Sequence, residues 1–184
     1  MLLHRIIPTR RNMMGYLSEK RYINARDGRI KTNVLWNDAD KLPPRHRSFK
    51  SFKTSLGDVN HYEIQISGYF VVIDVKYAFN HFTHNTYNDS RSHINGTLLA
   101  TLHDPIMMVR DNYEKQPTIT FYKTFKTEKD LYHIVMFKAY RKDNGKYYFK
   151  TIYKVDDNLQ KIKKIIKTID RNIIYFKYTE GNGS

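Results

Sequence analysis

The stretch TITFYKTFKTEKDLYHIVMFKAYRKDNGKYYFKTIYKV, residues 118–155, decides the fold class. Three segments in it, 118–126, 131–141 and 146–155, are rich in aromatic and β-branched side chains, which are typical of strands. Between the last two lies Asp-Asn-Gly-Lys, and Asn-Gly readily adopts the positive φ angles of a two-residue hairpin turn. The stretch therefore predicts an antiparallel meander.

Residues 61–77 predict a second hairpin on the N-terminal side of the meander. Polar and apolar residues alternate over 61–66, the chain turns at Ser67-Gly68, and a second strand runs over 69–77. The polar segment 79–93 is interpreted as a loop or an irregular helix start.

The rest of the chain predicts helices and two short strands. Residues 96–102 have a helical apolar spacing that ends before Pro105, and 106–109 form a short strand. Asn158 caps a helix that runs to about Ile169, and 173–178 add a last strand. The fold class is α+β, with an antiparallel β-sheet meander packed against one or two helices.

Composition predicts one domain with an appendage. In the chain of 184 residues, residues 1–60 carry basic clusters between turn signals and are interpreted as an irregular or weakly helical basic N-terminal extension. Residues 61–180 form the domain, and 181–184 form a flexible tail.

Charge points to a polyanionic partner. Lys and Arg number 32 against 18 acidic residues, a net charge of +14, and such a field attracts nucleic acid. Charge that serves only solubility, or a lysine-rich genome, is the alternative explanation. Cysteine is absent, which excludes disulfides and thiolate chemistry. No apolar run reaches bilayer length, and no glycine-rich phosphate loop or nucleophile elbow occurs.

Histidines supply the first candidate chemistry. His81, His84 and His93 lie close to Arg91 in one segment. A metal-free ribonuclease needs a base for the ribose 2′-OH, an acid for the leaving oxygen, and cations around the phosphorane. Surface histidines in a polar loop are the alternative. A zinc site with Asp89 is a weaker one, because the accompanying glutamate of a metalloprotease motif is missing; we expect no metal and no cofactor.

The strands supply the second set of candidates. Lys123 stands between Phe121 and Phe125 on one strand face, where an unpaired lysine is costly to bury, so we expect it to reach a cleft. Strand parity groups Thr151 and Tyr153 on one face with Tyr147 and Phe149. Thr151 could bind a phosphate oxygen and Tyr153 could stack on a base, although both residue types are also ordinary strand residues.

The order of these motifs resembles the phage-associated branch of the barnase–EndoU–colicin–RelE-like nucleases. A histidine pair precedes an arginine and a Leu-rich helix that ends near Asp-Pro; an aromatic-aromatic-lysine strand and a Thr-x-Tyr strand follow. The likeness covers about residues 61–157. It implies a toxin or phage effector that cleaves RNA, often tRNA or mRNA, without a metal and through a 2′,3′-cyclic phosphate.

The resemblance also implies roles for individual residues. His81 or His84 would act as general base or acid, Lys123 would stabilise phosphate charge, and Thr151 would hold a non-bridging oxygen. Arg91 would position the RNA backbone. The other expected contacts to RNA or phosphate come from Lys126, Lys150 and Tyr153.

Two other function classes remain open. One is a non-catalytic nucleic-acid-binding protein of the same fold, because Lys residues alternate with aromatic residues on the strands. The other is a virion or assembly protein whose charge meets an acidic partner. The nuclease hypothesis implies a cognate inhibitor protein, no membrane, and a location in the cytoplasm of a bacterial host cell or on a virion.

Overall fold

The computed structural model describes residues 39–83, 90–113, 115–129, 132–156 and 173–176. Its centre is the predicted meander of β5 (Gln116–Lys126), β6 (Tyr132–Arg141) and β7 (Tyr147–Asp156), paired antiparallel throughout. The prediction of a two-residue turn between β6 and β7 is wrong. Only Gly145 has positive φ there, and its N–H donates to the Lys142 carbonyl at 2.9 Å, which makes a longer loop.

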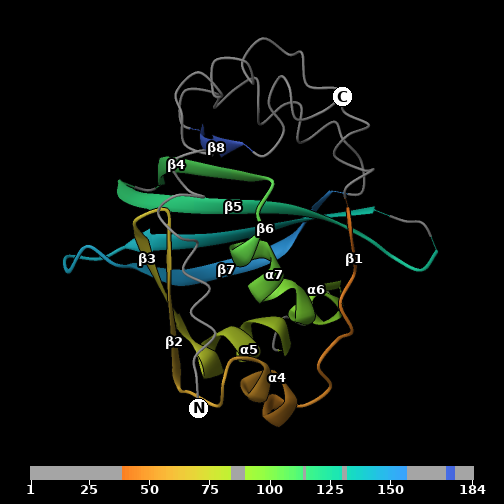
Figure 1. The fold of residues 1–184 in the computed structure, drawn as a ribbon. Coiled ribbons are helices and arrows are strands. Elements are labelled where there is room, and N and C mark those ends of the chain that lie inside the picture. Colours follow the sequence, from red (N-terminus) through yellow and green to blue (C-terminus); the bar gives the residue numbers. More distant parts are fainter. Residues whose placement is uncertain (1–38, 84–89, 114, 130–131, 157–172, 177–184) are drawn as a thin grey trace, which may run out of the picture.

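The predicted second hairpin flanks the meander. It consists of β2 (His61–Ile66) and β3 (Tyr69–Asp74), and both turn residues have positive φ, 52° at Ser67 and 78° at Gly68. The edge of the hairpin joins the meander because β3 pairs parallel to β7. With β4 (Met107–Tyr113) and β8 (Ile173–Phe176), the strands follow the order β2-β3-β7-β6-β5-β4-β8 in one curled, mostly antiparallel sheet (Figure 1).

The described helices gather against one face of this sheet (Figure 1). They are α4 (Phe49–Ser55), α5 (Val75–Thr83), α6 (Ser90–His93), the 3-10 turn η1 (Asn95–Thr97) and α7 (Leu98–His103). The predicted extension of the second hairpin strand to residue 77 is wrong, as is a loop over residues 79–83. Asp74 Oδ1 accepts the Tyr77 N–H at 2.8 Å, which caps a helix that begins at Val75.

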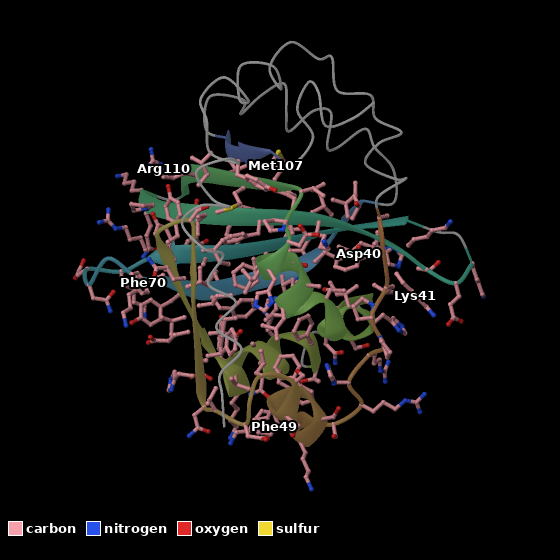
Figure 2. The ribbon with its side chains drawn as sticks, in the orientation of Figure 1. Asp40, Lys41, Phe49, Phe70, Met107 and Arg110 are labelled. Carbon is pink, nitrogen blue, oxygen red and sulfur yellow. The ribbon has the colours of Figure 1, made fainter. Side chains whose placement is uncertain are left out.

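Part of the predicted N-terminal extension belongs to the folded domain. β1 (Asp40–Lys41) pairs parallel to the end of β5 (Figure 2), and α4 (Phe49–Ser55) is capped by Ser48. Phe52 and Leu56 are each 1% exposed and lie in the core. The boundary expected at residue 60 is therefore wrong for residues 39–60. Residues 1–38, the helix predicted after Asn158 and the predicted tail lie outside the described residues.

The core lies between the helices and the inner sheet face, where Phe121, Phe137 and Phe149 pack ring against ring. On β5 the intervening side chains Thr120, Tyr122 and Thr124 are buried too, so both faces of this central strand are covered. Among the described residues, no helix is long and apolar enough to cross a bilayer.

Candidate active site

His81 lies near the C-terminal end of α5, where the helix meets the sheet. Val75, Ala78 and Phe82 are the buried residues of α5, and they fix the helix against the core. His81 is half-buried beside them, with its ring edge-on to Phe149 of β7 at a centroid distance of 5.6 Å. Packing of the helix on the core therefore fixes the position of the imidazole.

A β-bulge in β7 brings two consecutive residues to His81. Lys138 of β6 pairs with Thr151 but its neighbour Ala139 pairs with Phe149, so Lys150 is the extra residue. The bulge breaks the alternation expected along this strand, and Ile152, two positions after the bulged residue, joins Phe149 in the core. The predicted common face of Tyr147, Phe149, Thr151 and Tyr153 is thus not a regular one.

Three hydrogen-bond contacts converge on Nε2 of His81. Thr151 Oγ1 lies 2.9 Å from this nitrogen, Arg91 Nη1 lies 3.1 Å from it, and the Ile152 N–H donates to it at 3.4 Å. Arg91 comes from α6, so three separate segments of the chain build the cluster. The predicted residues His81, Arg91 and Thr151 are brought together, and we call these three with Ile152 the His81 cluster.

The partners of Nε2 define the form of the imidazole. A guanidinium and a backbone N–H can only donate, so Nε2 must be the acceptor and the proton of the neutral ring lies on Nδ1. Burial lowers the pKa of His81, and the positive charges of Arg91 and, to a smaller extent, Lys150 lower it further. His81 is therefore neutral at neutral pH, with its basic nitrogen directed at two donors.

Arg91 has spare capacity for an anion. Its Nε is buried and finds no acceptor among the described residues. A buried donor without a partner costs about 1–3 kcal/mol, and such groups are rare in folded proteins. The guanidinium also lies over the Tyr153 ring at 5.9 Å, which brings the predicted base-stacking residue next to the cluster.

Lys150 adds a positive charge beside the cluster. It is exposed at the bulge, its charge contributes to the lowered pKa of His81, and its Nζ lies 5.7 Å from the centroid of the Tyr140 ring. Lys150 and Tyr153, both predicted to contact RNA, thus lie next to the His81 cluster.

Lys123 has a different role from the predicted one. Its side chain is 3% exposed, and its Nζ lies 3.0 Å from Asp40 Oδ2 and 2.8 Å from Asp104 Oδ2. It also donates to the Asp104 carbonyl at 2.6 Å. An ammonium held by two carboxylates is already neutralised, so Lys123 ties β1 and the end of α7 to β5 rather than reaching an open cleft.

The remaining predicted residues lie elsewhere. Lys126 is at the end of β5, where its carbonyl accepts the Leu42 N–H at 2.8 Å. Lys126 therefore borders residues 40–46, which we call the β1 segment, and not the His81 cluster. His84 lies outside the described residues, so its predicted role stays a prediction. Within the described part of the chain, no group of three or more His, Asp or Glu residues could hold a metal ion.

Comparison with known proteins returned no relative. No protein-family model, curated protein or solved structure matches the chain.

Two features of the site were beyond sequence analysis. The Ile152 N–H is a backbone donor, and no residue pattern marks it. The sequence does not predict the bulge at Lys150 either, since Lys-Thr-Ile-Tyr continues the strand pattern without a glycine. The carboxylates of Asp40 and Asp104 could have been suspected only from the rule that a buried lysine needs a partner.

Proposed function

We propose that the protein is a metal-independent endoribonuclease whose active site is the His81 cluster. The observation that carries the proposal is the convergence of donors from Arg91, Thr151 and Ile152 on one imidazole nitrogen. Nε2 has a single lone pair and cannot satisfy three donors. A phosphate group, with several lone pairs on each non-bridging oxygen, could satisfy them all, and the unpartnered Nε of Arg91 would gain an acceptor as well.

The proposed reaction is transfer within the RNA strand. His81 Nε2 takes the proton of a ribose 2′-OH, and the 2′-oxygen attacks the adjacent phosphorus. The P–O5′ bond breaks, which leaves a 2′,3′-cyclic phosphate on one fragment and a 5′-hydroxyl on the other. The leaving 5′-oxygen receives a proton from a general acid, for which His84 is the sequence-based candidate.

Each group of the cluster has a task in this reaction. Arg91 and the Ile152 N–H neutralise the charge that grows on the phosphorane, and the Thr151 hydroxyl holds a non-bridging oxygen. Lys150 at the bulge and Tyr153 beneath Arg91 contact the strand on either side. A lowered pKa keeps His81 in the neutral form that a base requires.

Variants of the cluster test the proposal in an RNA cleavage assay with excess EDTA. We expect wild-type cleavage to fall by about 10²–10⁴-fold in His81→Ala and by a smaller factor in Thr151→Val. His61→Ala is the control, because this imidazole is exposed on β2 and pairs only loosely with Asp74, at 3.6 Å. Cleavage that survives His81→Ala at the wild-type rate would contradict the assignment.

A non-catalytic RNA-binding protein is the second candidate, and one observation favours it. Lys142 Nζ lies 4.1 Å from the centroid of the Tyr148 ring, and Tyr148 pairs across the strands with Tyr140, which Lys150 contacts. Such lysine–aromatic pairs on adjacent strands are typical of surfaces that bind single-stranded nucleic acid. RNA that stays intact but shifts on a native gel would favour this candidate.

A further inference from the structure

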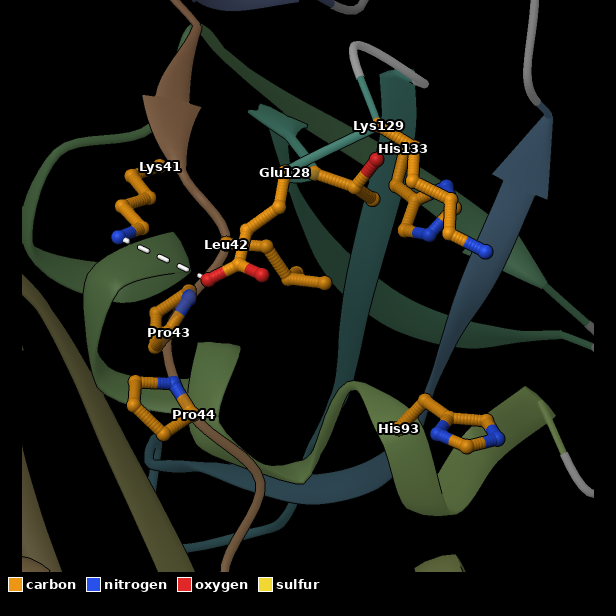
Figure 3. Close-up of a pocket in the computed structure, with 9 residues that line it drawn as sticks. Lys41, Leu42, Pro43, Pro44, His93, Glu128, Lys129 and His133 are labelled. Atoms are coloured by element: carbon orange, nitrogen blue, oxygen red, sulfur yellow. Dashed lines mark ion pairs between the residues drawn. The ribbon is translucent and has the colours of Figure 1, made fainter.

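A cavity of about 920 Å³ opens between the β1 segment, α6 and the connection from β5 to β6 (Figure 3). This size lies in the range of small-molecule sites. The lining residues are Lys41, Leu42, Pro43, Pro44, His93, Thr127, Glu128, Lys129 and His133. None of them belongs to the His81 cluster.

One wall of the cavity is apolar and held in place. Leu42, Pro43 and Pro44 form this wall. Two residues further on, the backbone of His46 is held to η1 by the side chain of Asn95, which is 3% exposed. Asn95 Oδ1 accepts the His46 N–H at 2.7 Å, and Asn95 Nδ2 donates to the His46 carbonyl at 2.8 Å. A fixed apolar wall suits the flat face of a nucleobase.

The polar lining is mainly basic. Lys41, Lys129, His93 and His133 face a single carboxylate, Glu128. The Lys41–Glu128 ion pair spans 3.9 Å and both side chains are at least 80% exposed, so it is weak and easily opened (Figure 3). The excess of positive charge suits a phosphate-bearing ligand, while the carboxylate can accept hydrogen bonds from an amino group of a base.

Helix α6 connects the cavity to the His81 cluster. Arg91 and His93 lie two residues apart on it, which places their Cα atoms about 5 Å apart and directs the side chains to opposite sides. Arg91 contacts His81 while His93 lines the cavity. A strand with one phosphate at Arg91 can therefore run past α6 and bring a nucleotide further along the chain to the cavity.

We infer that this cavity binds a nucleotide of the RNA strand that flanks the cleaved phosphate, an inference that rests on the proposed ribonuclease function. The base lies against the wall of Leu42, Pro43 and Pro44. Lys129 and His93 attract the phosphate, and Glu128 selects bases that carry an amino group. Adenine, guanine and cytosine should therefore be preferred to uracil.

The test is a titration of the full chain with AMP, GMP, CMP and UMP, none of which can be cleaved by attack of a 2′-OH on a bridging phosphate. We expect AMP, GMP and CMP to bind at least fivefold more tightly than UMP, and Glu128→Gln to remove the difference. Lys129→Ala should weaken all four, whereas Lys53→Ala on α4 should change none. Equal binding of inorganic phosphate and the four nucleotides, unchanged in both cavity variants, would overturn the inference.

The outcome separates this inference from the proposed function. In the cleavage assay, Lys129→Ala should raise KM with little change in kcat, because the cavity holds substrate and takes no part in the chemistry. Base-selective binding without RNA cleavage would support the nucleotide site and contradict the proposed nuclease function. Cleavage with a normal KM in Lys129→Ala and Glu128→Gln would contradict the nucleotide site and support the nuclease function.

Discussion

At the scale of single residues, the state of His81 follows from its neighbours rather than from its type. A histidine in a polar segment could be a solvated side chain, and the sequence alone leaves that alternative open. In the structure the ring is half-buried, and a guanidinium and a backbone N–H both donate to one nitrogen. Protonation of that nitrogen would set an N–H against two donors, so the neutral form is favoured.

The pH dependence of cleavage tests this state. Burial and, second, Arg91 lower the pKa of His81 from its usual 6.5. A lowered pKa means that the neutral base persists as the pH falls through 6.5. We therefore expect the acid limb of the kcat/KM profile to have its midpoint below 6.5.

Arg91→Gln removes the charge contribution and should move that midpoint toward 6.5 while it lowers the rate. Lys146→Ala is the matched control, since this cation pairs with Glu63 at 3.2 Å and is not among the causes of the His81 shift. A midpoint above 6.5 in the wild-type protein would contradict the neutral state of His81.

Lys123 is expected to matter for stability rather than for catalysis. Lys123→Met leaves Asp40 and Asp104 facing each other without a cation, and removal of one partner of a buried ion pair costs about 3–5 kcal/mol. The lower end applies, because both carboxylates are about half exposed and can be hydrated. Urea unfolding measures this loss, and Asp40→Asn should cost less since Asp104 remains. If Lys123→Met unfolds at the wild-type urea midpoint but has lost RNA cleavage, a catalytic role of Lys123 would be supported instead.

At the scale of elements, the sequence predicts the strands well and their irregularities poorly. Alternating aromatic and β-branched residues mark β5, β6 and β7 because these strands must match a buried sheet. The bulge at Lys150 has no such mark, because any residue can occupy it. α4 escaped prediction for another reason: a helix of 7 residues with Phe52 as its single buried side chain is too short to show a period.

Part of the candidate site was nonetheless predictable. The chemistry of their side chains predicts His81, Arg91 and Thr151 as site residues, and the fold brings them together although Thr151 follows His81 by 70 residues. The same reasoning predicts Lys123, yet its partners Asp40 and Asp104 come from segments that the strand pattern does not connect. Sequence patterns indicate which residue types can act, whereas long-range pairing decides which of them are already neutralised.

The clamp between η1 and the β1 segment gives a prediction at this scale. A Cβ at Gly96 would lie 2.4 Å from the Pro44 carbonyl oxygen, so Gly96→Ala must displace the wall of the cavity. Crowding of this kind costs about 1–3 kcal/mol. We expect lower thermal stability and faster amide exchange at His46.

Gly68→Ala is the comparison variant for Gly96→Ala. A Cβ at Gly68 would meet nothing within 4 Å, but the residue has a φ of 78°, so alanine strains only the hairpin turn. It should lower stability without faster exchange at His46. Equal exchange at His46 in wild type and Gly96→Ala would show that the clamp does not depend on this glycine.

At the scale of the whole molecule, the net charge of +14 governs how a polyanion is captured. RNA affinity should fall linearly with the logarithm of salt concentration, with a slope of about −0.7 for each phosphate contacted on a single strand. Contacts at Arg91, Lys150 and Lys129 together predict a slope of about −2. Filter binding of a labelled oligonucleotide to His81→Ala, from low to high salt, measures it. A slope near zero would contradict the capture of RNA through phosphate contacts at these three side chains.

The most direct test of the central claim is the chemistry of the RNA ends. Purified protein is incubated with total RNA in excess EDTA, and the fragments are analysed for their 3′ and 5′ groups. The account predicts 2′,3′-cyclic phosphate and 5′-hydroxyl ends in the wild-type digest, and none from His81→Ala. Fragments with 3′-hydroxyl ends, or identical digests from the two proteins, would contradict a ribonuclease site at His81.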